Sequence, residues 1–462
     1  MFIPSMEKTI DDITRPELQD FLRNLQGNIL KSHGRDHTAV LIITFGPPDP
    51  SAQPLAAKAW IRAMAENNRI TSAYEQEQQK RPERKGADMF QTLALSSRGY
   101  EFLSTRRPPD GAFRDGMQKR RSILKDLPVA KWEAPYQKDP GEIHALLQIA
   151  HKDRGPIDTE VAQVKKDIAA FGGRVLIEER GEQIRDGNRE AIEHFGYRDG
   201  VSQPLFVRSI DDPQNPRFDQ HSPLKLVLAP DPSGSQRFGS YLVFRKLEQN
   251  PKKFDDGINA VVGTSGMKVN AQLAGAMTIG RFKDGTPVVL HDTAQGIGGD
   301  ELDFDYGEDD DGQKCPFAGH VRKVNPRGEI PFLINLFARE QRRRIARRGI
   351  TYGGQRPDMT NGGALPTGGV GLLFMCYQND IADQFEFIQE TWANNSDFRK
   401  SDVGLDPIIG QTENNPRKVE ELPRWPVEWG TGEKKHVING DYVSLRGGEY
   451  FFAPSMATLK SI

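Results

Sequence analysis

Cysteine is nearly missing from this sequence of 462 residues, since only Cys315 and Cys376 occur and neither belongs to a CxxC pair. Two cysteines cannot build a disulfide framework, and cysteines without a close partner are poor candidates for a zinc site or a thiol redox motif. This usage is typical of a reducing compartment. We therefore expect a cytoplasmic protein without a disulfide framework.

Long apolar runs are missing as well. The apolar segments are short, such as AVLIITF at 39–45, whereas a membrane-spanning helix needs about 20 apolar residues. The first residues, MFIPSMEKTIDDITRPEL, carry acidic side chains early and have no apolar core, which is not the pattern of a secretory signal. We expect neither a membrane span nor secretion.

An excess of one charge is the third feature that the chain lacks. It has 62 basic and 64 acidic residues, and its formal net charge is −2. No overall field would therefore attract nucleic acid or anionic lipid. Local basic runs such as QRRRIARR at 341–348 are more often solvated faces than binding patches. We expect neither nucleic acid nor a membrane as a partner.

The chain is too long for one ordinary hydrophobic core, so two domains are expected. In the first half, four apolar, β-branched segments predict strands, and two segments with helical spacing of apolar residues predict helices. The strands are expected at 39–45, 88–96, 142–152 and 174–184, and the helices at 54–68 and 158–173. Two strand–helix–strand units in series indicate an α+β fold of the ferredoxin-like kind, an antiparallel sheet covered by helices.

A segment rich in Pro, Asp and Ser follows at 211–236, and we expect the domain junction there. Beyond it, strands are expected at 239–249 and 369–380, and a helix at 381–395. The second half thus repeats the order of strand and helix. We expect an N-terminal domain at 1–225 and a C-terminal domain of similar plan at 226–462.

Three short stretches contain residues that could carry chemistry, namely HFGYRDGVSQP (194–204), KCPFAGHVRKVNPRG (314–328) and RRRIARRGITYGG (342–354). Each also has an ordinary structural interpretation. Gly and Asp are common turn residues, and most loop histidines have no chemical role. A basic helix end stopped by Gly349 is equally ordinary, because cations are favoured there. No single stretch decides the function.

Taken together and in this order, Asp199 in GYRDG, His320 in CPFAGHVRK and an arginine in RRGITYG resemble the signatures of the dye-decolorising peroxidases. The resemblance continues in LQGNILKSH, GSYLVFRKLEQ, GLLFMCYQ with TWANN, and GGEYFFAPS, so it covers nearly the whole chain. It implies a haem enzyme of the larger, non-secreted class. The implied fold has two ferredoxin-like domains of the dimeric α/β-barrel type, with the haem held mainly by the C-terminal domain.

The resemblance also implies roles for single residues. His320 matches the axial ligand of the iron in haem b, bound once per chain. Asp199 matches the acid–base residue that moves a proton between the oxygens of hydrogen peroxide. Arg347, five residues before Tyr352, matches the arginine whose fixed charge stabilises the cleavage of peroxide, and Arg348 is the competing assignment.

Further residues are expected around this haem. Arg322 follows His320 closely and is a candidate for cofactor binding. Leu372 and Phe374 alternate along a strand, so they face one side together and either line the pocket or belong to ordinary sheet core. A dry pocket cannot admit a bulky dye, and the resemblance places oxidisable aromatics at Tyr352 and Trp392 as an electron relay. Packing is the alternative for both.

The sequence therefore predicts a haem peroxidase that reduces hydrogen peroxide and oxidises dyes, phenols and other aromatic reductants. The first alternative is a haem carrier, storage or processing protein that uses the same pocket without turnover. A haem-free α+β scaffold is the second, in which His320 is a structural loop residue. The physiological reductant and the oligomeric state, a homo-oligomer included, stay open at this point.

Overall fold

The structure is a computed structural model, and it describes residues 2–46, 54–79, 89–137, 140–208, 218–219, 222–296, 304–328, 341–354, 363–412 and 417–462. The loop predicted at 211–223 lies mostly outside these residues. All the predicted site residues lie within them.

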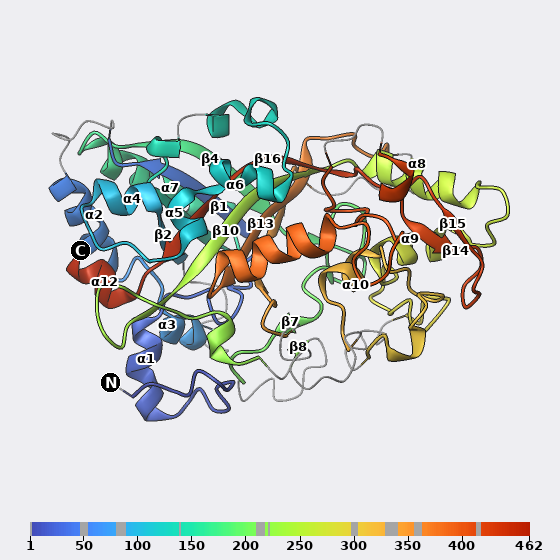
Figure 1. The fold of residues 1–462 in the computed structure, drawn as a ribbon. Coiled ribbons are helices and arrows are strands. Elements are labelled where there is room, and N and C mark those ends of the chain that lie inside the picture. Colours follow the sequence, from blue (N-terminus) through green and yellow to red (C-terminus); the bar gives the residue numbers. More distant parts are fainter. Residues whose placement is uncertain are drawn as a thin grey trace.

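The centre of the described chain is one antiparallel sheet of ten strands, visible across the middle of Figure 1. Its strands follow the order β11-β13-β10-β16-β2-β3-β1-β4, with β12 also beside β13 and β9 also beside β10. The strands are β1 (His37–Thr44), β2 (Phe90–Ser96), β3 (Ala145–His151), β4 (Arg174–Glu182), β9 (Ala229–Pro230), β10 (Phe238–Gln249), β11 (Ala346–Arg347), β12 (Ile350–Tyr352), β13 (Val370–Gln378) and β16 (Val443–Ala453).

Each half of this sheet has the strand order of a ferredoxin-like unit. The first half reads β4-β1-β3-β2, and the second reads β16-β10-β13 followed by β11 and β12, so both place their strands in the order fourth, first, third, second. The halves join where Phe451 and Phe452 of β16 pair with Ser96 and Leu95 of β2. The predicted α+β fold with two ferredoxin-like units is confirmed.

The two ends of the sheet meet, although the strand order separates them. Strand β12 contacts β4, and a Cβ atom at Gly181 would lie only 2.4 Å from Cγ2 of Ile350. The hydroxyl of Thr351 donates to the carbonyl of Glu182 and accepts from the amide of Ile184 at 3.3 Å. The sheet is therefore curled so that its edge strands are covered, which protects their backbone groups.

The helices cover this sheet as the apolar spacing predicts. In α2 (Pro54–Glu66) the buried residues include Trp60, Ile61 and Met64, which lie on one face of the helix. Helix α7 (Arg154–Ala169) buries four aliphatic side chains in the same manner. The other helices of the first half are α1 (Gln19–Asn24), α3 (Ala73–Gln78), α4 (Ser97–Phe102), α5 (Gly111–Asp115) and α6 (Met117–Leu124), and α12 (Met456–Ser461) packs on α2.

A second lobe contains elements that the sequence analysis did not predict. It is formed by α8 (Pro251–Val262), α9 (Ala271–Ile279), α10 (His320–Val324), β14 (Arg424–Pro426) and β15 (Lys434–His436), on the right of Figure 1. A separate apolar cluster fills it, and Phe195 and Tyr197 beside the GYRDG motif belong to that cluster. The main apolar core and the sheet both cross the expected domain boundary after residue 225, and the boundary itself stays a prediction.

The helix expected at 381–395 is present with unusual geometry. It consists of two segments with wide π-type turns, η9 (Ile381–Glu386) and η10 (Ile388–Ala393). Asp380 begins it, since its carboxylate accepts from the amide of Asp383 at 2.7 Å. Wide turns of this kind are frequent near functional sites, and η10 packs directly against α10.

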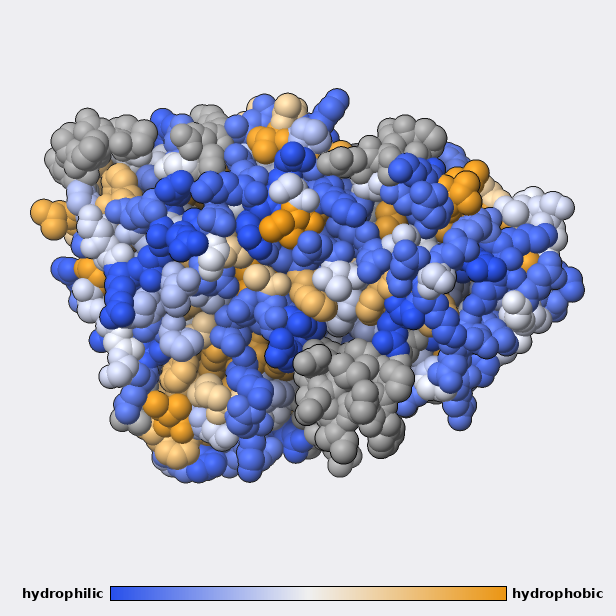
Figure 2. All heavy atoms as spheres, in the orientation of Figure 1, coloured by the Kyte–Doolittle hydropathy of each residue, from blue (hydrophilic) through white to orange (hydrophobic). Residues whose placement is uncertain are grey.

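The surface agrees with the composition. On the face shown in Figure 2 hydrophilic residues predominate, and apolar ones form only small groups. Among the described residues no helix is both long and apolar enough to cross a membrane.

The seam between β4 and β12 gives a stability prediction. Replacing Thr351 with Val keeps the size of the side chain but removes the hydroxyl, so the amide of Ile184 loses its partner. We expect a loss of about 1–2 kcal/mol in the free energy of unfolding, measured by urea denaturation. Thr351→Ser keeps the hydroxyl and should lose less, and equal losses for both variants would contradict a role for the hydrogen bonds.

Candidate active site

His320 is the first residue of the short helix α10, directly after Gly319. A Cβ atom at Gly319 would lie 3.0 Å from the carbonyl oxygen of Met277 and 3.1 Å from that of Pro316. Gly280, the C-cap of α9, has φ +109° and leaves no room for a side chain against Val321. Glycines at both positions let α9 and α10 approach closely, which fixes where His320 begins its helix.

A carboxylate orients the ring of His320. Its Nδ1 lies 2.8 Å from Oδ2 of Asp406, which is fully buried. The other oxygen of Asp406 accepts from the amides of Ile408 and Ile409 at 2.8 and 3.0 Å. Burial opposes ionisation of Asp406, but His320 and these amides hold its pKa below the ordinary value. Since a carboxylate only accepts, Nδ1–H is the donor, and in a neutral imidazole the lone pair then lies on Nε2.

Asp406 was not predicted from the sequence, and Lys323 explains how it reaches His320. The buried ammonium of Lys323, on the same helix as His320, donates to the carbonyls of Asn395 at 2.8 Å and Gly404 at 2.7 Å. Burial lowers the pKa of Lys323 to about 7. These bonds fix the segment before Asp406 to α10. An acidic residue within the apolar run VGLDPIIG was the one available signal.

Asp199 lies in a tight turn, so the structural interpretation of GYRDG also holds. Its amide donates to the carbonyl of Ala191 at 2.9 Å, and its Oδ1 accepts from the amide of Gly200 at 2.7 Å. Gly200 has φ +78°, a conformation that favours glycine. Among the described residues none is recorded as a partner of Oδ2, so one carboxylate oxygen stays available for chemistry.

Arg347 and Arg348 point to opposite faces of the sheet. Their strand pairs with β13 so that Arg347 lies beside Cys376, and side chains alternate between the two faces. Arg347 therefore shares a face with Leu372 and Phe374. Arg348 turns to the other face, where its buried guanidinium donates to the carbonyls of residues 28 and 29 at 2.7 and 3.0 Å. Burial lowers the pKa of Arg348 to about 10.

Arg347 connects the strand to the turn of Asp199. Its Nη2 donates to the carbonyl of Val201 at 2.7 Å, and its amide donates to Oε1 of Gln203 at 3.2 Å. The same turn is connected to the segment after His320, because Arg327 donates to the hydroxyl of Ser202. The structure thus links the three stretches that the sequence analysis selected.

His194 lies in the same HFGYRDG stretch, five residues before Asp199. It is buried, and its Nε2 lies 2.7 Å from the carbonyl oxygen of Tyr352. The imidazole therefore ties the GYRDG segment to β12.

Leu372 and Phe374 are only half-buried, whereas Leu373 and Met375 between and after them are buried. Since alternate residues of a strand face opposite sides, the face that carries Leu372 and Phe374 is partly open at these two residues, although Cys376 on the same face is fully buried. The open face carries Arg347 and the two apolar side chains. Such a face is available to an apolar ligand.

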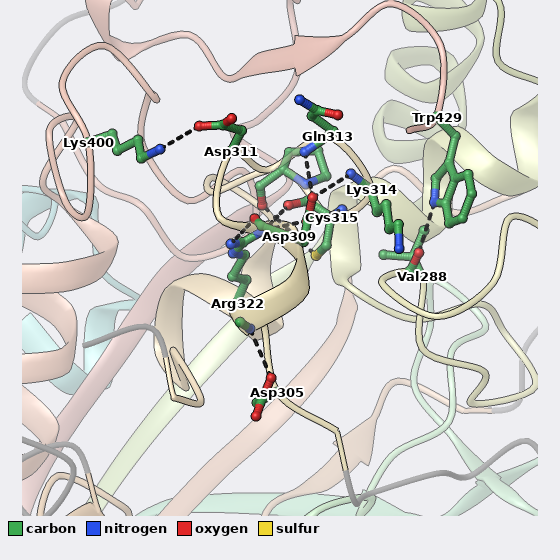
Figure 3. A network of polar contacts seen from close by, with 12 residues as sticks. Val288, Asp305, Asp309, Asp311, Gln313, Lys314, Cys315, Arg322, Lys400 and Trp429 are labelled. Carbon is green, nitrogen blue, oxygen red and sulfur yellow. Dashed lines mark hydrogen bonds and ion pairs between the residues drawn. The ribbon is translucent and has the colours of Figure 1, made fainter. Parts of the chain in front are cut away.

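Arg322 lies deep in a polar network, shown in Figure 3. It is buried, its Nη1 lies 2.7 Å from Oδ2 of Asp309, and its Nη2 donates to the backbone carbonyl of Asp309 at 2.8 Å. The guanidinium also lies over the rings of Tyr306 and Phe317, at 4.5 and 4.3 Å from their centres. Asp309 accepts in turn from the amides that precede and include Cys315. These contacts hold the loop before His320, and the predicted contact with a cofactor stays a prediction.

The two predicted relay residues are both buried. Trp392 in η10 stacks on Phe398 with ring centres 5.4 Å apart. Tyr352 lies beneath the ammonium of Lys246, 5.1 Å from its ring centre. Burial raises the pKa of Tyr352 well above the ordinary value. Because Tyr352 pairs with Gly371, its side chain points away from the face of Leu372 and Phe374.

The donor set fits a haem group. A metal-binding histidine commonly donates its second ring N–H to a carboxylate, as His320 does to Asp406. Three further features are compatible with a haem pocket, namely the partly open apolar face, a carboxylate oxygen on Asp199 and the cation of Arg347. Among the described residues no cluster of three or more His, Cys, Asp and Glu could hold a metal by itself.

A cavity of about 290 Å³ lies elsewhere, and none of the predicted site residues lines it. Its walls come from the start of β1, the end of β4, the first turn of α7 and the glycines after Tyr352. It is therefore a feature separate from the candidate active site.

Comparisons with known proteins agree with this geometry, although no family model matches the chain. A multifunctional dye peroxidase of Amycolatopsis sp. is 36% identical, over 96% of this chain and 97% of its own length. A dye-decolorizing peroxidase of Auricularia auricula-judae is 30% identical, over 79% of this chain and 74% of its own length. The crystal structure of a DyP-type peroxidase of Anabaena sp. superimposes with a TM-score of 0.89 at 36% identity, covering 100% of this chain and 98% of that one.

The network around Arg322 gives a test of its role. Arg322→Met would leave the buried carboxylate of Asp309 without its cation, and we expect the free energy of unfolding to fall by about 3–5 kcal/mol. Chemical denaturation monitored by circular dichroism measures this loss. A variant of unchanged stability that binds haem poorly would instead assign Arg322 to the cofactor.

Proposed function

The chain belongs to the family of dye-decolorising peroxidases, and we propose that it works with one haem b, held by His320, to reduce hydrogen peroxide and oxidise dyes. Because its relatives are peroxidases, the protein is an oxidoreductase that uses peroxide as the electron acceptor. The observation that supports the assignment of His320 is its hydrogen bond with the buried Asp406.

Haem supplies, when bound, an iron that takes up the oxidising equivalents of peroxide. Nε2 of His320 is the nitrogen that would bind this iron, since Nδ1 is engaged. The negative charge of Asp406 makes the imidazole a stronger donor and fixes the orientation of its ring. Leu372 and Phe374 would exclude water from the open face of β13.

Asp199 and Arg347 are proposed to act on peroxide itself. Oδ2 of Asp199 would take a proton from one oxygen of hydrogen peroxide and return it to the oxygen that leaves as water. The guanidinium of Arg347 would stabilise the negative charge that develops during this cleavage. Its hydrogen bond with Val201 holds it beside the turn of Asp199. Arg348 is not placed to contact peroxide in this way, because its guanidinium donates to backbone carbonyls on the other face of the sheet.

The reductants are proposed to be dyes, phenols and other aromatic molecules. A bulky dye cannot enter an enclosed pocket, so electrons must pass through the protein, and Tyr352 and Trp392 are the candidates that the sequence suggested. A cytoplasmic location is part of the same proposal. It is supported by Cys315 and Cys376, both buried thiols.

A haem carrier or storage protein was the alternative function. It is not favoured, because the relatives that match nearly the whole chain are peroxidases. A carrier would also have no use for an acid–base carboxylate beside an arginine.

The haem ligand can be tested by replacing His320 with Ala. We expect the fold to persist, because α10 is short and His320 is partly exposed, while haem retention after reconstitution falls to the level of non-specific binding. Absorption spectra measure the haem, and circular dichroism measures the fold. His37→Ala, at the first residue of β1, is the control and should retain haem. A His320→Ala protein with full haem and an unchanged spectrum would place the ligand elsewhere.

The assignment of Asp199 and Arg347 can be tested by the rate of reaction with peroxide. Asp199→Asn and Arg347→Leu should each keep the haem and slow this reaction by about two orders of magnitude or more, the usual size of such losses. Stopped-flow absorption gives the rate. Arg348→Leu is the matched control, which should lose stability and keep its rate. The opposite behaviour of the two arginine variants would exchange their roles.

A further inference from the structure

A polar cluster that extends from the core towards the surface lies next to Tyr352 and has no part in the chemistry described so far. It contains Tyr136 in η4 (Ala134–Gln137), Glu133 just before it, Glu179 in β4 and Lys246 in β10. The hydroxyl of Tyr136 donates to Oε1 of Glu179 at 3.0 Å. Nζ of Lys246 lies 2.9 Å from Glu179 and 2.7 Å from Glu133. Removing charged groups from water costs folding free energy. The presence of this cluster therefore suggests that it has a function.

The sheet itself separates this cluster from the proposed haem face. Lys246 pairs with Leu373 and Tyr352 pairs with Gly371. Both side chains therefore project from the face of β13 opposite to Leu372 and Phe374.

The requirements of electron transfer distinguish the two tyrosines. A phenol that loses an electron becomes a strong acid, so its oxidation in a low-dielectric core requires an acceptor for the proton. The buried hydroxyl of Tyr352 has no hydrogen-bond partner among the described residues. The ammonium of Lys246 above its ring further opposes the loss of an electron. Tyr136 has the opposite environment, because a carboxylate accepts from its hydroxyl.

We propose that Tyr136, with Glu179 as its proton acceptor, is an oxidisable residue that carries electrons from external reductants to the active site. This inference rests on the proposed peroxidase function, which supplies the oxidant. In the step, the oxidised active site gains one electron from Tyr136. The phenolic O–H bond breaks, and the proton forms a new O–H bond on Glu179. A neutral tyrosyl radical and a neutral carboxylic acid result, so no new charge is buried, and an aromatic reductant later restores the electron.

The surroundings of Glu179 support this step. Burial raises the pKa of its carboxyl, which makes it a better base for the phenolic proton. When Glu179 is protonated, Lys246 keeps an ion pair with Glu133. The exposed fractions of the side chains rise from 9% for Glu179 to 12% for Lys246 and 29% for Glu133, so the cluster leads from the interior to solvent.

A second buried tyrosine provides a matched control. The hydroxyl of Tyr450 donates to Oε1 of Glu386 at 3.0 Å, the same distance as in the first pair. Glu386 is held by the guanidinium of Arg120, whose Nε lies 3.0 and 3.2 Å from its two oxygens. Protonating Glu386 would break this two-point ion pair, and the next carboxylate, Asp115, is 3.9 Å from Arg120. Tyr450 therefore lacks a usable acceptor.

The experiment uses the haem-loaded protein with ring-deuterated tyrosine, mixed with one equivalent of peroxide without reductant and frozen for high-field electron paramagnetic resonance. The parent should show a tyrosyl radical whose gx value indicates a hydrogen bond to the phenoxyl oxygen. Tyr136→Phe should lose this signal. Glu179→Gln should lose it too, although the tyrosine remains, because an amide cannot take the proton. Tyr450→Phe should keep the parent signal.

Other outcomes would overturn the inference. A parent-like radical in Tyr136→Phe, or its loss in Tyr352→Phe or Tyr450→Phe alone, would assign the radical to another residue. An undiminished radical in Glu179→Gln would show that Glu179 is not the acceptor. The haem absorption after addition of peroxide distinguishes failure of this inference from failure of the proposed function. If the spectrum changes and no Tyr136 radical forms, the inference alone fails, whereas an unchanged spectrum in the parent would overturn the proposed function with it.

Discussion

The pairing of β11 and β12 with β13 is the constraint on which the candidate active site depends. This single register, Arg347 beside Cys376 and Tyr352 beside Gly371, assigns each side chain to one face of the sheet. A shift by one residue would exchange the two faces completely. The register therefore decides that Arg347 joins Leu372 and Phe374, while Arg348 becomes a structural residue of the core.

The second constraint is the contact between the halves of the molecule. The sheet is continuous from one ferredoxin-like unit to the other and curls until β12 meets β4. The turn of Asp199 comes from the first half, yet Arg347 and Arg327 of the second half hold it in place. Two units that form one sheet can thus build a site to which both contribute, and neither half would complete it alone.

Much of the fold could be predicted from the sequence. The four strands of the first half and the helices α2 and α7 are found close to their expected bounds, because β-branched runs and helical spacing of apolar residues are local signals. Helices α8 and α9 were missed. The buried residues of α8, such as Phe254, Ile258 and Val261, do have helical spacing, but Gly and Asp residues interrupt the segment and weaken the signal.

The sequence by itself determined the order of the candidate motifs and the residues Asp199 and His320, and it narrowed the arginine to Arg347 or Arg348, since each motif is short and can be recognised without knowing the fold. Only the tertiary structure decided their partners. Asp406 is 86 residues from His320, and Glu179 is 43 residues from Tyr136. A carboxylate becomes a partner of an imidazole or a phenol through distance and burial, and both properties arise only when separate elements pack. The choice between Arg347 and Arg348 has the same origin, because neighbouring residues differ in the face of the strand they occupy, not in their chemistry.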